Sequence, residues 1–288
     1  MYHENVKIYK SLILLGENLN DTIVDGGKGE YIFNITNDDV EIVGFTIQNS
    51  SSNGTGIKIT SNRDYRVLYN LIRNCSYGIS IENSTSGVIY GNRLIGNSIG
   101  LHLNKFYNSQ VSSNVFIENE IGIEGWMIKD TNIWDNQISL NTNGFYLYNS
   151  QNNTISRNKI YWNEIAIKLY KSSNNRFIKD NTSLNAIPGI TCYFSNNNYI
   201  VDCKGAVALH DNCSNNHISN NTGLISLYHN SSNNTIVNSK GGIWIVNSSN
   251  NSFIKSYCQH ITIIDNSSNN KIIDNNICLL YTSPSPRD

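Results

Sequence analysis

Four ionisable residues occupy outward positions of a repeated pattern and are the candidates for catalysis. They are Glu82, His102, Glu124 and Lys168. Glycoside hydrolysis requires two carboxyl groups about 5 to 9.5 Å apart, whereas a polysaccharide lyase typically requires an acidic metal cluster with a base. Glu82 and Glu124 are two repeats apart, or roughly 10 Å at the spacing of neighbouring strands. No pair of aspartates recurs at the repeat spacing, so we interpret these four residues as solvated surface side chains in preference to a catalytic site.

Three further residues are the candidates for a metal site: His210, His229 and Cys213, which could approach one another on neighbouring repeats. A soft site for copper requires clustered Met, Cys or His side chains. The two Met, six Cys and six His of this chain are scattered, and Cys213 occupies a column otherwise filled by serine. The residues therefore predict a packed cysteine in preference to a ligand, and no cofactor.

A column of aromatic residues is the most informative outward feature. Its rings follow a recurrent glycine by four residues, and Tyr146 and Trp244 extend it in the neighbouring outward column. Because inward positions alternate with these, the rings should stand on the surface about 4.8 Å apart, a spacing that suits stacking and the binding of sugar rings. Stacking that only stabilises the fold and an interface for a protein partner are the alternatives. The candidate ligand-binding residues are Trp126, Tyr146, Tyr148, Tyr170, Tyr193 and Tyr228.

These positions can be aligned because the whole chain is an internal repeat. A β-branched or Phe residue returns every 22 residues from Val67 to Phe177, and then at intervals of 23, 18, 18, 17 and 19. Three residues after it stands a small residue, usually asparagine, whose amide carries both donors and acceptors and can form a ladder with its neighbours. The ladder candidates are Asn70, Asn92, Asn114, Asn136 and Asn158.

Each repeat reads as short period-2 strands separated by Asn, Gly and Ser turns, with no helical stretch. A strand that returns parallel to itself without a crossover helix is a β-solenoid coil. The period does not divide into sixes, which disfavours a left-handed hexapeptide solenoid. We therefore predict an all-β, right-handed parallel β-helix of about twelve coils, of 22 and then about 18 residues. The shorter coils should lose the strand that follows the asparagine turn and narrow the rod.

Composition excludes several other classes. Charged residues make up only 15% of the chain and the formal net charge is −1, which gives no electrostatic reason to expect nucleic acid as a partner. No run of 18 apolar residues exists, so no membrane span is predicted. We expect residues 1–280 to form one β-helix domain without its N-terminal cap or a signal peptide. Residues 281–288 break the pattern and resemble a non-native tail or scar.

The sequence resembles NosD-type proteins of the pectin-lyase-like β-helix superfamily. The resemblance rests on residues 5–18, 22–27 and 40–49, which look like the opening of that family, and on Asn-x-Ile and Gly-Ile-x-Ile coils through residues 5–278. It implies an exported protein, either a periplasmic factor for the copper site of nitrous-oxide reductase or a surface protein with a carbohydrate-related helix. Copper as a cofactor is implied by this resemblance only.

We therefore expect an extracellular, cell-surface or periplasmic β-helix that acts as a non-catalytic scaffold or as a module binding a surface glycan or another surface protein. Two alternatives remain: a periplasmic copper-binding maturation factor for nitrous-oxide reductase, and a polysaccharide lyase or glycoside hydrolase. The chain by itself does not choose between them, because fold-level motifs do not specify activity.

Overall fold

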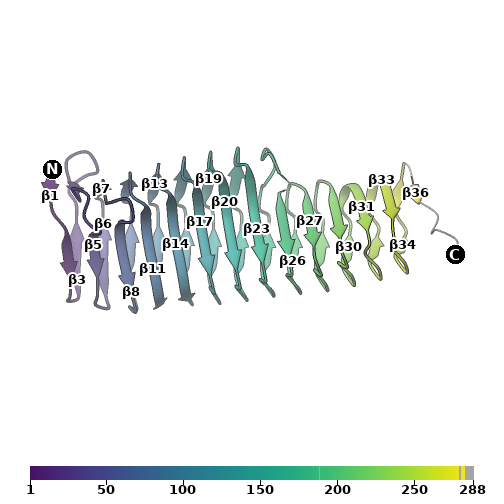
Figure 1. Ribbon diagram of the computed structural model, residues 1–288, viewed down its shortest axis with the longest axis horizontal. Coiled ribbons are helices and arrows are strands. Elements are labelled where there is room, and N and C mark those ends of the chain that lie inside the picture. The colour runs from purple at the N-terminus through teal and green to yellow at the C-terminus, as the bar shows by residue number, and fades with distance from the viewer. Residues whose placement is uncertain (188, 279, 283–288) are drawn as a thin grey trace.

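The protein is a right-handed parallel β-helix, as the repeat predicts (Figure 1). The computed structural model describes residues 1–187, 189–278 and 280–282. Three parallel sheets run along the rod, and each strand pairs with the strand one coil away. In the described residues, no helix is long and apolar enough to cross a membrane.

The first sheet has 15 strands and carries the aromatic column. Its strands are β2 (Val6–Ile8), β5 (Tyr31–Ile35), β8 (Thr55–Thr60), β11 (Tyr77–Thr85), β14 (Ile99–Tyr107), β17 (Ile121–Trp126), β20 (Asn143–Tyr148), β23 (Ile165–Tyr170), β25 (Ile190–Tyr193), β27 (Val207–His210), β29 (Ile225–Tyr228), β31 (Lys240–Val246), β33 (Tyr257–Ile264), β35 (Asn276–Ile277) and β36 (Leu280–Thr282). Both β35 and β36 pair with β33. The expected domain end at 280 falls within β36, and residues 283–288 lie outside the described residues.

The second sheet has 13 strands and runs the length of the rod. Its strands are β3 (Leu12–Leu15), β6 (Val40–Val43), β9 (Arg66–Leu68), β12 (Val88–Tyr90), β15 (Gln110–Ser112), β18 (Asn132–Trp134), β21 (Thr154–Ser156), β24 (Arg176–Ile178), β26 (Tyr199–Val201), β28 (His217–Ser219), β30 (Thr235–Val237), β32 (Ser252–Ile254) and β34 (Lys271–Ile273).

The third sheet has only eight strands and ends at Tyr161, a little beyond the middle of the 288-residue chain. Its strands are β1 (Tyr2–His3), β4 (Ile23–Asp25), β7 (Thr46–Gln48), β10 (Leu71–Arg73), β13 (Arg93–Ile95), β16 (Val115–Ile117), β19 (Gln137–Ser139) and β22 (Lys159–Tyr161). Beyond β22 this side continues only as single bridges between coils. The shorter coils therefore lack a strand of this sheet, as predicted, but its loss begins one coil earlier, after Asp180, where the repeat is still 23 residues long.

The core is a stack of like positions, because a 22-residue coil brings residue i under residue i+22. Ile79 pairs with Leu101, and Leu101 pairs with Ile123. All three side chains are fully buried, and burying one such side chain is worth about 1.5–3 kcal/mol. The neighbouring inward column, which contains Leu103 and Leu147, lacks a side chain at Gly125. Leu147 with Ile128 fills the space, since a Cβ on that glycine would lie 2.8 Å and 3.1 Å from their methyl carbons.

The predicted asparagine ladder is present in the interior of the rod. The backbone N–H of Asn92 donates to Oδ1 of Asn114 at 2.9 Å, and its Nδ2 donates to the same oxygen and to the carbonyl of Val67 at 2.7 Å. Asn70, Asn114 and Asn136 repeat this pattern, and Asn158 continues it to Asp180. Each amide thereby satisfies its own hydrogen-bonding groups and those of the adjacent turn.

Two further asparagine ladders follow other corners of the rod. One contains Asn97, Asn119, Asn141, Asn163 and Asn185, and the other contains Asn153, Asn175, Asn198, Asn216, Asn234, Asn251 and Asn270. The second one explains the Asn-Asn doublets of the sequence. The first asparagine of a doublet has a left-handed backbone, as at Asn152 with φ of 57°, which asparagine tolerates. The second asparagine is the ladder member.

Candidate ligand-binding face

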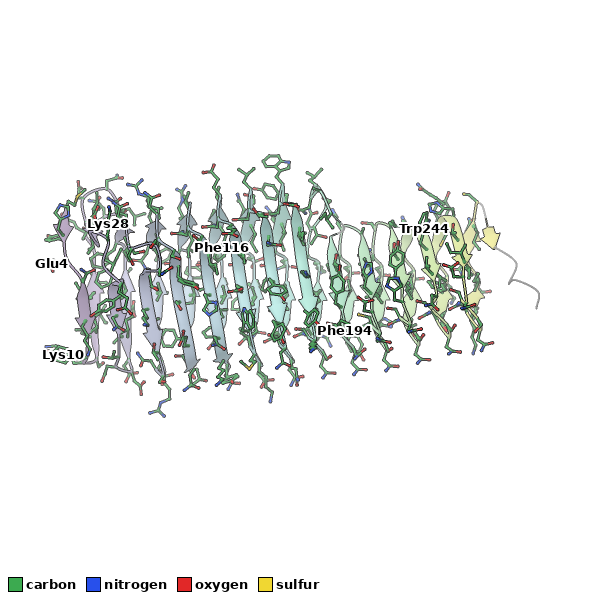
Figure 2. All side chains as sticks on the ribbon, in the orientation of Figure 1. Glu4, Lys10, Lys28, Phe116, Phe194 and Trp244 are labelled. Carbon is green, nitrogen blue, oxygen red and sulfur yellow. The ribbon has the colours of Figure 1, made fainter. Side chains whose placement is uncertain are left out.

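The outer face of the first sheet presents two adjacent rows of side chains. The inter-strand register places His102, Glu124, Tyr146 and Lys168 on four consecutive strands, from β14 to β23; we call them the charged row. Beside it lies the aromatic row, which consists of Trp126, Tyr148, Tyr170, Tyr193, His210 and Tyr228. Alternation along each strand turns both rows outward while the intervening residues enter the core. Figure 2 shows the side chains that project from the rod, among them Trp244, which is 41% exposed.

The aromatic row consists of two separate stacks. Trp126 lies 4.6 Å from Tyr148 between ring centroids, and Tyr148 lies 5.5 Å from Tyr170 with the rings nearly parallel. Tyr193, His210 and Tyr228 form the second stack, with centroid distances of 5.1 Å and 4.7 Å. The row divides between Tyr170 and Tyr193, at the point where the Tyr170 ring forms an edge-to-face contact with Phe194, with centroids 5.4 Å apart. The rings lie on the surface in line, as the sequence predicts, and their role in binding stays a prediction.

The charged row contains one tight pair that residue spacing did not single out. Nδ1 of His102 lies 2.7 Å from Oε2 of Glu124, and their side chains are only 17% and 12% exposed. Burial raises the pKa of Glu124, but the hydrogen bonds of His102 and Trp126 together with the charge of His102 outweigh it, so the pKa lies below its usual value. Glu82 is exposed in the other outward column and does not join this pair.

Lys168 and Tyr146 complete the charged row next to this pair. Nζ of Lys168 lies 5.8 Å from the ring centroid of Tyr146 and 5.3 Å from that of Tyr193, which is the range of cation–π contacts. Burial, and after it the charge of Glu124, raises the pKa of the Tyr146 hydroxyl. Tyr146 therefore stays protonated at neutral pH and can donate a hydrogen bond to a ligand.

The three metal candidates serve other purposes. Cys213 is buried, its Sγ accepts from the backbone N–H of Ser195 at 3.3 Å, and burial raises its pKa to about 11. His210 is stacked in the aromatic row, and Nδ1 of His229 lies 3.1 Å from Oδ1 of Asp211. Among the described residues, no group of three or more His, Cys, Asp and Glu is arranged to hold a metal ion.

Replacing Cys213 by serine should change stability by less than about 1 kcal/mol, because the position belongs to a ladder of serines. At equivalent corners, Ser231 N–H donates to the hydroxyl of Ser248, and Ser248 N–H to that of Ser267. Cys192→Ser is the matched control, since it places a hydroxyl in the apolar core and should cost roughly 1–3 kcal/mol. Urea unfolding would measure both, and equal losses would contradict the ladder assignment.

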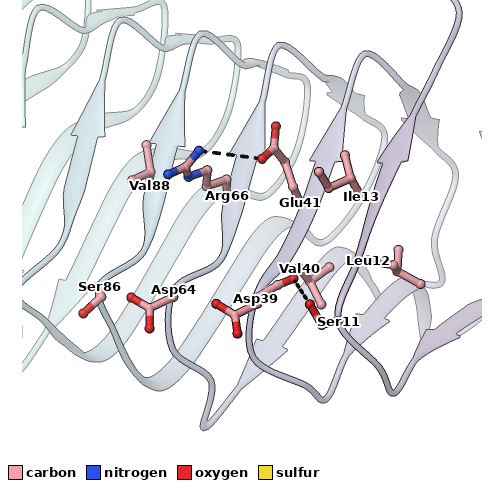
Figure 3. Close-up of a pocket in the computed structure, with 10 residues that line it drawn as sticks. All are labelled: Ser11, Leu12, Ile13, Asp39, Val40, Glu41, Asp64, Arg66, Ser86 and Val88. Carbon is pink, nitrogen blue, oxygen red and sulfur yellow. Dashed lines mark hydrogen bonds and ion pairs between the residues drawn. The ribbon is translucent and has the colours of Figure 1, made fainter.

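A separate shallow depression of 360 Å³ lies on the outer face of the second sheet near the N-terminus (Figure 3). Arg66 and Glu41 form an ion pair there at 3.8 Å. Ser11 donates to the backbone carbonyl of Asp39 at 2.9 Å. The close-up shows the carboxylates of Asp39 and Asp64 in a second row, beside the row that holds Glu41 and Arg66. The acidic groups thus stand in separate rows and do not converge on a point.

This fold defines a parallel β-solenoid with an outward face built of aligned rows. Residues 16–186 match the family described as "Periplasmic copper-binding protein (NosD)", and residues 126–256 match "Right handed beta helix region". The first match spans more than half of the 288 residues. The chain therefore belongs to the NosD family. The comparison with curated proteins gives no match.

Several solved structures share the fold. The A-module of the mannuronan C-5 epimerase AlgE4 of Azotobacter vinelandii aligns with a TM-score of 0.71 at 16% identity, over 98% of this chain and 85% of that one. The A-module of the mannuronan C-5 epimerase AlgE6 of the same organism aligns with a TM-score of 0.72 at 14% identity, over 99% of this chain and 89% of that one. The catalytic unit of a GH87 α-1,3-glucanase from Streptomyces thermodiastaticus aligns with a TM-score of 0.67 at 13% identity, over 99% of this chain and 62% of that one. At such identities the likeness shows the fold alone.

The copper in the family description does not fit the residues that this structure describes. A soft copper site requires converging thiolate, thioether or imidazole ligands. Cys213 is a protonated member of a hydrogen-bond ladder, and His210 is stacked between two tyrosines. No step that involves copper follows from this arrangement.

Proposed function

We propose that this protein is an exported binding module that holds a glycan along its aromatic row. The observation that carries the proposal is the stack of Trp126, Tyr148 and Tyr170, one ring per coil, half-exposed on the outer face of the first sheet. The coil spacing of about 4.8 Å is close to the advance of one sugar residue in an extended glycan. Successive rings can therefore meet successive sugars.

The charged row supports a sugar over a purely apolar partner. Ligand sites combine an apolar surface with a few well-placed polar groups. Here the Tyr146 hydroxyl, the Lys168 ammonium and the His102 imidazole run beside the rings and can bond sugar hydroxyls. The assignment to exported glycan binding is supported by two neighbours in fold, a mannuronan C-5 epimerase module and an α-1,3-glucanase, and by the family's description as periplasmic.

A glycan-array screen of the wild type and of Trp126→Ala, Tyr148→Ala and Tyr170→Ala tests this proposal. Loss of one ring of the row should weaken binding about tenfold, which corresponds to about 1.4 kcal/mol. Tyr90→Ala is the matched control, since Tyr90 is an exposed tyrosine packed on Tyr69 on the second sheet. Unchanged binding in all three variants would exclude the row as the site.

A second candidate function is acid–base chemistry on the same glycan, and the His102–Glu124 pair favours it. A carboxylate bonded to Nδ1 orients the ring and leaves Nε2 free to accept a proton. In an elimination on a uronate polymer, His102 would take the proton next to the carboxyl group while the Tyr146 O–H protonates the departing glycosidic oxygen.

Glu124→Gln separates this candidate from simple binding. If the chemistry occurs, wild-type protein incubated with polymannuronate or polygalacturonate should form unsaturated products, seen by ultraviolet absorbance, and Glu124→Gln should lower the rate by at least about a hundredfold while array binding persists. A wild type that leaves both polymers intact would reject catalysis on uronates and leave the binding proposal in place.

A further inference from the structure

The narrowed side of the rod carries a row of lysines that neither function above uses. Single parallel bridges connect Lys159, Asn181, Lys204, Thr222 and Lys240 on five consecutive coils. Lysine thus occupies every second coil, at intervals of about 9.6 Å. We call Lys159, Lys204 and Lys240 the lysine row.

The row is exposed and electrostatically unbalanced. All three lysines are exposed, and none forms an ion pair with any residue that the structure describes. The bridge positions between them are neutral. The nearby carboxylate of Asp202, two residues before Lys204, accepts a hydrogen bond from Asn220. The row therefore offers regularly spaced positive charge in a chain whose charge is otherwise sparse.

Two depressions lie beside the row where the third sheet has ended. One of 250 Å³ is lined by Thr182, Leu184 and Gly205, among others. The other, of 610 Å³, is lined by residues that include Lys240 and Tyr257. We call the strip formed by residues 182–187, 204–206, 222–224, 240–242 and 257–260 the shoulder groove.

The coils of the shoulder groove carry glycine, and the exposed apolar side chains of Leu184 and Leu224 stand beside these glycines. Gly205, Gly223 and Gly241 have φ of 127°, 149° and 144°, which side chains rarely adopt. A Cβ on Gly223 would also lie 2.5 Å from the carbonyl oxygen of Gly205. The C-terminal end of the groove is bordered by the half-exposed ring of Tyr257 and by His260, whose Nε2 accepts a hydrogen bond from Nε1 of Trp244.

We propose that the shoulder groove binds a linear acidic polysaccharide in which every second sugar carries a negative charge. One sugar residue advances by about one coil, so charges on alternate sugars would face lysines on alternate coils. The exposed side chains of Leu184, Leu224 and Tyr257 offer apolar contact to the faces of sugar rings. An acidic peptide is disfavoured because the N–H groups of Gly205 and Gly223 already donate to Thr222 and Lys240 carbonyls, which leaves them unable to pair with an added strand.

The test measures binding of fluorescent hyaluronan, in which every second sugar carries a carboxylate, to the full chain at low and physiological salt. Lys204→Gln combined with Lys240→Gln should weaken binding at least about tenfold at low salt, and salt should weaken the wild type similarly. The matched control is Lys7→Gln combined with Lys10→Gln, which removes the same charge from exposed positions on the first coils. Trp126→Ala should leave hyaluronan binding unchanged, which separates this site from the aromatic row.

Three outcomes would overturn the proposal. Equal losses in the two double variants would show a non-specific effect of net charge. Competition by poly-glutamate as effective as that by hyaluronan would favour an acidic peptide as the occupant. Absence of wild-type binding at low salt would exclude the site, provided that circular dichroism shows the β-rich fold.

Discussion

Replacing Asp180 by asparagine is expected to stabilise the protein above pH 7 by up to about 4 kcal/mol. Burial raises the pKa of Asp180 from 3.8 to about 7, although hydrogen bonds from Asn158 and the charge of Arg157 oppose that rise. Three pKa units correspond to about 4 kcal/mol. Because the folded-state pKa lies above the unfolded one, stability is highest below about pH 4 with respect to this group and falls as the pH rises through 7.

The ladder explains why a carboxylate is unfavourable at this position. Oδ1 of Asp180 accepts from the N–H and the Nδ2 of Asn158 at 2.8 and 2.9 Å. Its Oδ2 is buried without a hydrogen-bond partner among the described residues. In the asparagines of the ladder, the atom equivalent to Oδ2 of Asp180 is the amide nitrogen Nδ2. This nitrogen donates a hydrogen bond to a backbone carbonyl of the preceding coil, as Asn158 does to Ile133. Asparagine at position 180 restores that donor, whereas an ionised aspartate places a negatively charged oxygen where the donor should be.

Urea unfolding between pH 4 and pH 8 would measure the effect. Wild-type stability should fall across this range relative to Asp180→Asn, and the two curves should converge at acid pH. Asp135→Asn is the control, because Arg157 lowers the pKa of this exposed carboxyl. Replacing the carboxyl of Asp135 should therefore produce no increase in the free energy of unfolding at neutral pH. Parallel curves for the wild type and Asp180→Asn would contradict the assignment of a buried, raised-pKa carboxyl.

Replacing Asn114 by leucine is expected to destabilise the protein by roughly 3–5 kcal/mol. Asn114 lies in the middle of the ladder and is fully buried. Its Nδ2 donates to the carbonyls of Ile89 and Ser112 at 2.9 and 3.0 Å, and its Oδ1 accepts the N–H and the Nδ2 of Asn92. The substitution leaves these buried groups without partners, at a cost of about 1–3 kcal/mol each when unrelieved.

Asn132→Ala is the matched control, since Asn132 is an exposed strand asparagine in the neighbouring coil. Its loss should change stability by less than about 0.5 kcal/mol. Hydrogen exchange should show lost protection near Asn92 and Asn136 in Asn114→Leu, because each coil of a solenoid contacts only its neighbours. Equal stability of the two variants would refute a stabilising role for the ladder.

Much of the fold could be predicted because residues one coil length apart in the sequence occupy equivalent positions on neighbouring coils. Residues 22 apart, such as Ile79 and Leu101, must share a column once the coil has that length. The buried asparagines, the outward rings and the missing third-sheet strand of the shorter coils follow from the same alignment, whereas the loss of that strand already in the coil after β22 does not. Stacked like side chains make register strongly specified, since a slip of one residue would turn every inward side chain outward.

The details of the candidate site depended on the side chains in space. The column predicts that Tyr170 and Tyr193 are neighbours, yet the Tyr170 ring meets Phe194, and the row divides there. The sequence places His102 and Glu124 on adjacent coils, but only the side-chain conformations show a bond of 2.7 Å. Rotamers depend on local packing, which a period does not contain.

What the sequence by itself determined is therefore the coil: its length, its inward columns, its asparagine turns and the outward face. The tertiary structure decided which of the aligned positions contact one another and which stay exposed. Lys159, Lys204 and Lys240 each follow the repeated β-branched column by four residues, so the alignment already places them in one row. Only the folded chain shows that the third sheet ends after β22 and that this side then continues as single bridges. The same holds for the contact between His102 and Glu124, because hydrogen bonding between coils and the choice of rotamer depend on local packing.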